Sequence, residues 1–443
     1  MLHRFLLYVG LLGLLAGPAA AQTFNTAKLD SLLTGLAATK RMMGSVALTH
    51  DGQVVYSQAF GAAQLTPPVA ATPATHYRIG SITKVFTTVM IFQLIEEKKL
   101  TLSTPLATFF PQLPNAKTIT IDQLLSHRSG LHSFTSDPAY ESYLAQPKTQ
   151  AELLAIIAQT TPDFAPDTKA AYSNSNFVVL GYIVEKLTRQ PYAQALQQRI
   201  ATKAGLKDTY YGGKIGSRPQ EAFSYEPAAG SWKPATETDL SIPGGAGAVV
   251  STPTDLDRFL TALFGGKLVA ASSLAAMQTM RDHFGRGLFA MPFGTQPGYG
   301  HTGGIDGFTS QATYFPADKL ALAVCSNGGS YSTNDVGLAA LSIYYGRPYH
   351  LPNLAPSTFV PAAADLARYA GTYASPQFPL KITMTPEGTT LRSQATGQDS
   401  FLLDPVSPGI FTFDSAHIRI EFDPAKPTLT LKQGAGSYVF TKE

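Results

Sequence analysis

A serine and a lysine three residues apart are the side chains in this 443-residue chain most suited to covalent chemistry. Ser81 and Lys84 belong to the run at residues 77–84, and a mostly apolar stretch without glycine or proline follows at 85–94. That stretch predicts a helix buried nearly all round, and a helix beginning near Ser81 places both side chains on one face. A buried amine with a lowered pKa can take the serine proton, and helix N-terminal N–H groups suit a developing oxyanion. The spacing fits an acylating serine hydrolase, although it also fits a serine that caps an ordinary helix.

Two short polar motifs downstream could complete such a site. Residues 172–174 read Tyr-Ser-Asn before a predicted helix, and residues 301–304 read His-Thr-Gly-Gly at the start of a predicted strand. A phenol beside a positive charge can act as general base or acid, and an amide can hold a substrate carbonyl or orient the lysine. The strand could lie beside the nucleophile and supply a backbone N–H, with Gly303 and Gly304 letting substrate approach closely. Alone, each motif equally fits a helix cap or a turn.

The elements that must position these motifs indicate an α+β or α/β domain. Apolar runs around Asp51-Gly52 and around residues 316–318 predict two hairpins, and a long helical region lies between them. This order favours an antiparallel sheet over repeated βαβ units. Helices are predicted at 27–36, 121–127, 151–159, 176–187, 192–204, 254–263 and 335–345.

Two segments have a different texture. Residues 212–247 are rich in Gly, Pro, Ser and Thr with little periodicity, which predicts a long loop in which Trp232 either shapes the cleft edge or covers the core. Four prolines between 347 and 361 predict a linker, and the short strand-like runs beyond it predict a small all-β barrel or sandwich. We therefore expect a signal peptide at 1–21, a hydrolase domain at 22–346, a Pro-rich linker at 347–364 and a β-barrel-like domain at 365–443.

The N-terminus predicts export. Arg4, the short apolar run 5–15 and Ala19-Ala20-Ala21 fit a cleaved secretory signal, with an uncleaved N-terminal anchor as the alternative. The expected location is periplasmic or secreted. Cys325 is the only cysteine, so an internal disulfide is excluded and we expect core packing as its role.

Composition narrows the function classes. Hydrophobic residues make up 44% and charged residues 14%, which is typical of a globular chain, and the net charge of +3 is too scattered to indicate nucleic acid. The nine histidines show no metal-ligand spacing, so we expect neither a metal nor a cofactor.

Together the motifs resemble the serine β-lactamase-like superfamily, which includes class C β-lactamases, D-alanyl-D-alanine carboxypeptidases and related esterases and D-amino-acid peptidases. The resemblance covers roughly residues 27–346 and implies an α/β/α sandwich with an antiparallel sheet plus an all-helical subdomain, with the site in the cleft between them. The tail from about residue 369 is similar to the small β-barrel appended to many such hydrolases. The matching segments are 77–84, 124–131, 172–176, 244–247 with 251–256, and 300–304.

The resemblance assigns roles residue by residue. Ser81 is the nucleophile, Lys84 takes or shuttles its proton, and Tyr172 is the general base that also activates the deacylating water. Asn174 binds the acyl side chain. The N–H groups of Ser81 and Gly304 form the oxyanion hole. His127 lies in a matching segment, but we interpret it as a buried structural histidine.

The motif at 301–304 departs from the Lys-Thr-Gly of many β-lactamases. His301, Thr302 and Gly303 are expected to bind substrate with Gly304, but neutral imidazole is a weaker anchor for a carboxylate than ammonium. The resemblance therefore favours a peptidase or esterase over a dedicated β-lactamase.

The sequence thus predicts an exported serine hydrolase that acts through a Ser81 acyl-enzyme. Its substrate would be an amide, an ester or a D-amino-acid peptide, with β-lactams and peptidoglycan fragments as further candidates. No nucleic acid and, after signal cleavage, no membrane is expected as a partner. The alternative is a non-catalytic or slowly acylating sensor that binds peptidoglycan or penicillin.

Overall fold

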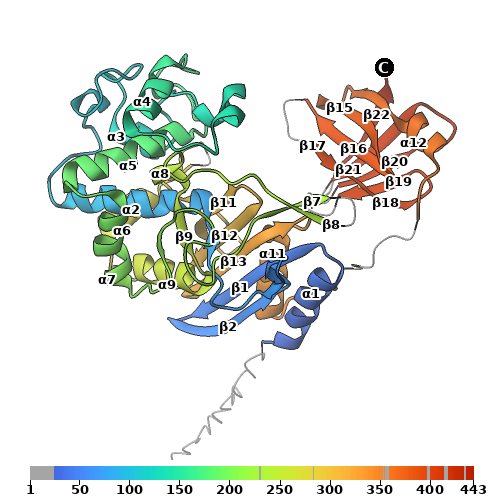
Figure 1. Cartoon of the computed structure of the whole chain (residues 1–443), viewed down its shortest axis with the longest axis horizontal. Coiled ribbons are helices and arrows are strands. Elements are labelled where there is room, and N and C mark those ends of the chain that lie inside the picture. The colour runs from blue at the N-terminus through green and yellow to red at the C-terminus, as the bar shows by residue number, and fades with distance from the viewer. Residues whose placement is uncertain are drawn as a thin grey trace, which may run out of the picture.

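The computed structural model describes residues 24–443 apart from 229–230, 283, 353, 355–358, 397–399, 414–417 and 434–435. The expected signal peptide at 1–21 lies outside the described residues. Figure 1 shows a main body of helices around a sheet and a separate C-terminal lobe of strands. Within the described ranges, no helix has both the length and the apolar character needed to cross a bilayer.

The main body is built on a six-stranded antiparallel sheet in the order β10-β11-β12-β13-β1-β2. Asp51 and Gly52 join β1 to β2 with φ values of 47° and 77°, as a two-residue type I′ turn requires, so the first expected hairpin is confirmed. The expected hairpin of β12 and β13 is confirmed too. The strands are β1 (Met42–His50), β2 (Gln53–Phe60), β10 (Phe289–Ala290), β11 (Tyr299–Ile305), β12 (Phe308–Phe315) and β13 (Leu320–Gly329).

Helices cover both faces of this sheet. Helices α1 (Thr26–Ala38) and α11 (Thr333–Tyr344) pack on one face, and α9 (Pro253–Phe264) packs on the other. Because strand side chains alternate, residues 320, 322 and 324 of β13 join the core under α1 and α11, whereas residues 321, 323 and 325 join the core on the α9 side. Cys325 is therefore buried in the core, where it is a free thiol.

The central helix α2 (Thr83–Glu96) is buried along nearly its whole length, as its uninterrupted apolar sequence predicts. It lies between α5 (Asn174–Thr188) and α9, where Phe86 stacks on Phe259 with ring centroids 3.8 Å apart. Figure 1 shows α2 between the helical region and the sheet.

Two helices of the helical region, α3 and α4, begin at threonine N-caps. The hydroxyls of Thr120 and Thr149 accept the third N–H of α3 and α4, and both sites are complete capping boxes. The remaining helices of the main body are α3 (Ile121–Leu125), α4 (Gln150–Gln159), α6 (Tyr192–Leu196), a π turn (Gln197–Ala201), α7 (Thr202–Ala204), α8 (Gly244–Gly247) and α10 (Ala271–Gln278). Single 3-10 turns lie at Gly80–Ile82, Leu106–Thr108, Phe134–Ser136 and Pro138–Ser142.

The expected loop at 212–247 contains a hairpin that the sequence analysis missed. Strands β7 (Tyr225–Ala228) and β8 (Ser231–Pro234) pair there, and Trp232 on β8 lies over Gly328 at the end of β13. The prolines in both strands and the lack of alternation hid this pairing. Minor sheets are formed by β3 (Ala62–Gln64) with β4 (Val69–Ala70), and by β5 (Tyr77–Arg78), β9 (Val249–Ser251) and β6 (Tyr210–Tyr211).

The C-terminal lobe is an antiparallel nine-stranded sheet around its own apolar core, preceded by α12 (Ala363–Tyr369). The expected α+β class and small all-β C-terminal unit are thus confirmed. Strands β14 and β18 were not expected, because β14 opens with glycine and β18 contains Pro405. The strands are β14 (Gly371–Ser375), β15 (Phe378–Glu387), β16 (Thr390–Ala395), β17 (Ser400–Leu402), β18 (Asp404–Ser407), β19 (Ile410–Phe413), β20 (Ile418–Phe422), β21 (Thr428–Gln433) and β22 (Gly436–Lys442).

Candidate active site

Ser81 lies in the 3-10 turn Gly80–Ile82 that leads directly into α2. Two glycines let this turn sit against β11. A Cβ at Gly80, where φ is 49°, would lie 2.8 Å from the Gly304 nitrogen, and a Cβ at Gly303 would lie 2.1 Å from the carbonyl oxygen of Ile79. The close neighbour of Gly303 is thus the chain itself, and this approach brings the Gly304 backbone to the edge of the serine turn.

Lys84 is fully buried beneath Ser81, and its three polar neighbours are all uncharged. Its Nζ lies 2.9 Å from Ser81 Oγ, 2.8 Å from Asn174 Oδ1 and 2.8 Å from the Ala246 carbonyl oxygen. Burial lowers the pKa of the Lys84 ammonium well below its usual 10.5. A neutral amine has two N–H bonds, which the two carbonyl oxygens can accept, so its lone pair is left for the hydroxyl of Ser81.

Tyr172 lies just before α5, close to both Ser81 and Lys84. Lys84 Nζ is 4.9 Å from the centroid of its ring. Burial raises the pKa of the Tyr172 phenol above 10, and its hydrogen bond with Ser81 offsets only part of that rise. Burial therefore favours the protonated form of the phenol and the neutral form of the Lys84 amine. These opposite shifts favour Lys84 over Tyr172 as the group that accepts the serine proton.

His127 supports the Tyr172 ring. The two rings stack with centroids 4.4 Å apart, and His127 Nδ1 accepts the backbone N–H of Ser173 at 3.1 Å. Burial lowers the pKa of His127 well below 6.5. A neutral, buried, hydrogen-bonded ring agrees with its interpretation as a structural histidine.

Asn174 occupies the first position of α5, and both ends of its amide are engaged. Its Oδ1 accepts from Lys84, and its Nδ2 donates to Thr135 Oγ1 at 2.8 Å. The amide is thereby fixed between the lysine and the cavity wall. Thr135 was missed by the sequence analysis because it lies in a 3-10 turn that carries no motif.

His301 is buried rather than presented to solvent. Its ring stacks on Phe289 with centroids 4.1 Å apart and lies 6.3 Å from the Tyr172 ring. Its Nδ1 donates to the Thr302 carbonyl, and its Nε2 has no hydrogen-bond partner among the described residues. Burial lowers the pKa of His301 to about 3. The imidazole is therefore neutral at physiological pH.

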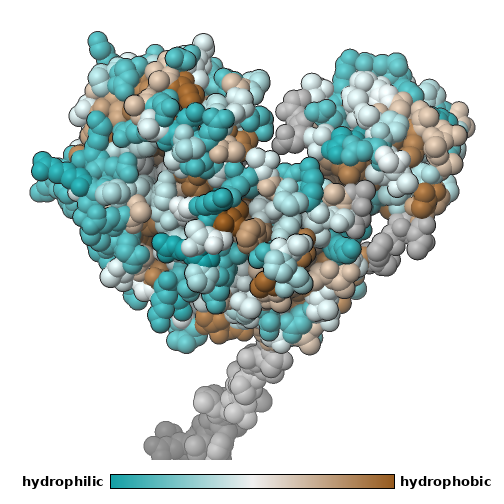
Figure 2. Space-filling view, in the orientation of Figure 1, coloured by the Kyte–Doolittle hydropathy of each residue, from teal (hydrophilic) through white to brown (hydrophobic). Residues whose placement is uncertain are grey.

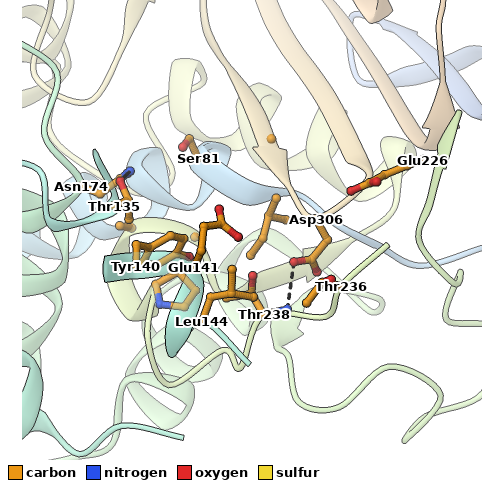
Figure 3. Close-up of a pocket in the computed structure, with 15 residues that line it drawn as sticks. Ser81, Thr135, Tyr140, Glu141, Leu144, Asn174, Glu226, Thr236, Thr238 and Asp306 are labelled. Carbon is orange, nitrogen blue, oxygen red and sulfur yellow. Dashed lines mark hydrogen bonds between the residues drawn. The ribbon is translucent and has the colours of Figure 1, made fainter. Parts of the chain in front are cut away.

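A cavity of about 370 Å³ opens beside Ser81 (Figure 3). Of the expected site residues, Ser81, Asn174 and Gly304 line it, whereas Tyr172, His301, Thr302 and Gly303 are not part of its lining. Ala246 and Gly247 come from the matching segment 244–247, and the rest of the wall comes from segments outside the matching ones. These other lining residues are Thr135, Tyr140, Glu141, Leu144, Glu226, Thr236, Thr238, Pro243, Ala246, Gly247, Ile305 and Asp306.

The cavity wall contains three carboxylates and no lysine or arginine. Asp306 is paired with the buried Arg78 at 2.9 Å, and Glu226 is paired with Lys233 at 2.9 Å. Glu141 is exposed and forms no ion pair within the described part of the chain. Figure 3 shows its carboxylate pointing into the cavity. The uncompensated charge of this wall is therefore negative.

No cluster of three or more His, Cys, Asp or Glu side chains able to hold a metal ion occurs among the residues that the structure describes.

The chain is similar to known proteins over most of the main body. The family model described as Beta-lactamase matches residues 29–343. Penicillin-binding protein 4 of Amycolatopsis lactamdurans is 28% identical over 363 residues, which cover 74% of this chain and 92% of that protein. Teichoic acid D-alanine hydrolase of Staphylococcus aureus (strain MRSA252) is 26% identical over 225 residues, about half of each chain: 51% of this one and 55% of that one. The crystal structure of D-amino acid amidase from Ochrobactrum anthropi SV3 has a TM-score of 0.64 and 27% identity, and it covers 72% of this chain and 99% of its own.

Proposed function

Because the chain belongs to the Beta-lactamase family, we propose that it is an exported hydrolase that acylates Ser81 and then releases the acyl group to water. The observation that carries this proposal is the contact of 2.9 Å between Ser81 Oγ and the buried Lys84 Nζ. A lysine with a lowered pKa and only neutral partners is suited to take the serine proton.

The first half of the reaction forms the acyl-enzyme. As Ser81 Oγ bonds to the substrate carbonyl carbon, Lys84 takes its proton and the carbonyl electron pair moves to the oxygen. The N–H groups of Ser81 and Gly304 stabilise that oxyanion. Tyr172 then donates its phenol proton to the leaving nitrogen or oxygen as the bond to the carbonyl carbon breaks, and Lys84 returns a proton to Tyr172. Water repeats these steps in reverse order to release the acid.

The charges of the cavity favour a substrate that carries an ammonium group near its acyl carbon. Glu141 is an uncompensated carboxylate in the wall, whereas the neutral His301 offers no charge to a substrate carboxylate. The D-amino acid amidase and the teichoic acid D-alanine hydrolase among its relatives are named for substrates that contain a D-amino acid. We therefore propose D-aminoacyl amides or esters as the substrate class, ahead of penicillins and peptides that end in a carboxylate.

Export is proposed from the N-terminal sequence, with cleavage before Gln22. The mass of the protein recovered from the periplasm or the medium tests this. A chain that begins near Gln22 is expected, and a full-length chain retained in the membrane fraction would contradict it.

The direct test of the reaction is turnover of D-alanine p-nitroanilide and intact mass after incubation with a penicillin, for wild type and for Ser81→Ala. Release of p-nitroaniline by wild type alone is expected, with little or no penicillin adduct. A persistent penicillin adduct without turnover would instead support the slowly acylating sensor. The similarity to penicillin-binding protein 4 favours this second candidate function. Turnover that survives Ser81→Ala would contradict both.

A further inference from the structure

A second hollow lies between the main body and the C-terminal lobe, where Figure 2 shows an indentation in the surface. Its volume, about 570 Å³, exceeds the 370 Å³ of the cavity beside Ser81. The main body contributes the β7–β8 hairpin, Thr309 of β12, and the segment 329–333 that runs from the end of β13 into α11. The lobe contributes β16, β17 and β19. We refer to it as the interdomain groove.

The interdomain groove adjoins the active-site cavity. Glu226 on β7 lines both hollows, and Figure 3 places it across the cavity from Asn174. A molecule bound at Ser81 that extends past Asp306 towards Glu226 therefore reaches the groove without leaving the surface of the protein. An ion pair of 3.2 Å between Arg41 and Asp404 also joins the lobe to the main body.

The lobe side of the groove contains an apolar patch beside Arg392 and Ser400. Phe401 and Phe413 stack with ring centroids 4.1 Å apart, and both rings and Leu402 are only half-buried. Such a partly wetted aromatic pair gains free energy when another apolar group covers it.

The cations at the groove are already neutralised. Lys233 is paired with Glu226 at 2.9 Å, and Arg392 is paired with Glu387 at 2.6 Å. An anionic ligand would have to compete with these carboxylates, whereas an apolar ligand would not. The groove is therefore suited to an apolar occupant.

We infer that the interdomain groove is a distal subsite that binds the apolar extension of a substrate whose carbonyl group reacts at Ser81. The inference rests on the proposed function, because it takes acyl transfer at Ser81 as given. The shared wall at Glu226 identifies the occupant as part of the same substrate molecule. The C-terminal lobe then selects among substrates by length and hydrophobicity, while the chemistry stays in the main body.

The test is a series of D-2-amino acid p-nitroanilides with unbranched side chains that lengthen from D-alanine to D-2-aminododecanoic acid. The ammonium group and the leaving group are the same in every compound of the series, so only the length of the apolar side chain changes. For wild type, kcat/KM is expected to rise by at least about tenfold once the chain is long enough to reach the groove, since each buried methylene adds binding energy. Phe401→Ala removes half of the aromatic pair and Ser400→Trp fills the groove from an exposed strand end. Both should cut that gain to about threefold or less and leave turnover of the D-alanine compound unchanged.

Val439→Ala is the matched control, because Val439 is an exposed apolar side chain on β22 outside the groove. It should keep the full gain. The inference is overturned if kcat/KM is independent of chain length, if Ser400→Trp leaves the gain intact, or if the variants slow short and long substrates equally. No turnover of any compound by wild type would refute the proposed function instead. Binding of D-2-aminododecanoic acid to the groove would then be measured by thermal shift, and a shift equal in wild type and Ser400→Trp would refute the subsite.

Discussion

At the residue scale, the site depends on how burial divides protons between two neighbours. Lys84 and Tyr172 are both removed from water, and desolvation disfavours the charged form of each. It therefore lowers the pKa of the amine and raises that of the phenol. These opposite shifts are what the proposed mechanism requires, with the lysine as the base and the phenol as the acid. A sequence motif gives the residue types but not this division, because the division depends on burial.

Replacing Lys84 with arginine should abolish acylation. Arginine stays protonated at every accessible pH and cannot accept the serine proton, so kcat/KM for D-alanine p-nitroanilide should fall by about 10²- to 10⁴-fold. Lys203→Arg, at an exposed lysine of α7, is the matched control and should retain full activity. In wild type, kcat/KM should fall only as pH drops through the lowered pKa of Lys84, far below 10.5. A rate that rises steadily up to pH 10 would contradict a neutral Lys84.

Glu141 should distinguish substrates with a free ammonium group. Glu141→Gln is expected to lower kcat/KM for D-alanine p-nitroanilide by about 10- to 150-fold, the range for losing one charge-assisted hydrogen bond. The N-acetylated compound has no ammonium group, so its rate should not change. Glu226→Gln is the matched variant, and its effect should be smaller because Lys233 already neutralises Glu226. Equal losses on both substrates would show that Glu141 acts on the fold and not on the ammonium group.

At the element scale, the serine turn and β11 must meet backbone to backbone. Gly80 combines a positive φ of 49° with a neighbouring Gly304 nitrogen 2.8 Å from the position of a Cβ. The motif at 301–304 and the residues around Ser81 predicted such an approach. The sequence could not tell which glycine packs against the chain itself and which faces open space. The contacts show that Gly303 packs against Ile79, whereas no atom lies closer than 4.0 Å to the Cβ position of Gly304.

Gly80→Ala should therefore impair activity more than its backbone cost explains. The positive φ costs an alanine about 1–2 kcal/mol of stability. The clash with Gly304 in addition forces β11 away from Ser81, so kcat/KM should fall at least about tenfold if β11 supplies an oxyanion donor. Gly52→Ala isolates the first effect, because Gly52 has a φ of 77° and no atom within 4 Å of its Cβ position. Thermal unfolding and kcat/KM of the two variants separate the cost of the positive φ from the effect of the clash with Gly304. Equal activity of both variants would mean that the clash does not displace β11.

The sequence predicted elements well where apolar periodicity was strong and poorly where pairing was decided by distant segments. Helix α2 and the β1–β2 hairpin follow from their own residues. The β7–β8 hairpin does not, because its strands contain proline and are placed by contact with β13. The residues of the cavity wall could not be predicted for the same reason. Glu141 lies in the 3-10 turn Pro138–Ser142 and Glu226 on β7, and neither segment carries a motif that places it beside Ser81. His301 was located correctly on a strand, but its burial depends on Phe289 of β10, a strand of two residues.

At the scale of the whole molecule, one buried carboxyl group links stability to pH. Asp257 on α9 is fully buried against β1, where its Oδ2 accepts the hydroxyl of Thr49 at 3.0 Å, and its Oδ1 has no partner among the described residues. Burial raises the pKa of Asp257 well above 3.8, and the Thr49 hydrogen bond offsets only part of this. The folded protein therefore keeps a proton on Asp257 that the unfolded chain releases.

Asp257→Asn should make the protein less sensitive to rising pH. Below pH 3.8 both states of wild type bind the proton and its stability is unaffected. Between 3.8 and the raised pKa the unfolded chain loses that proton first, so the free energy of unfolding falls by up to about 1.4 kcal/mol for each pH unit. Asparagine is neutral in both states, so the melting temperature of the variant should rise relative to that of wild type between pH 5 and pH 8. Asp51→Asn, in the exposed β1–β2 turn, should follow wild type. Melting curves of wild type and Asp257→Asn that stay parallel across this range would mean that Asp257 ionises in the folded core.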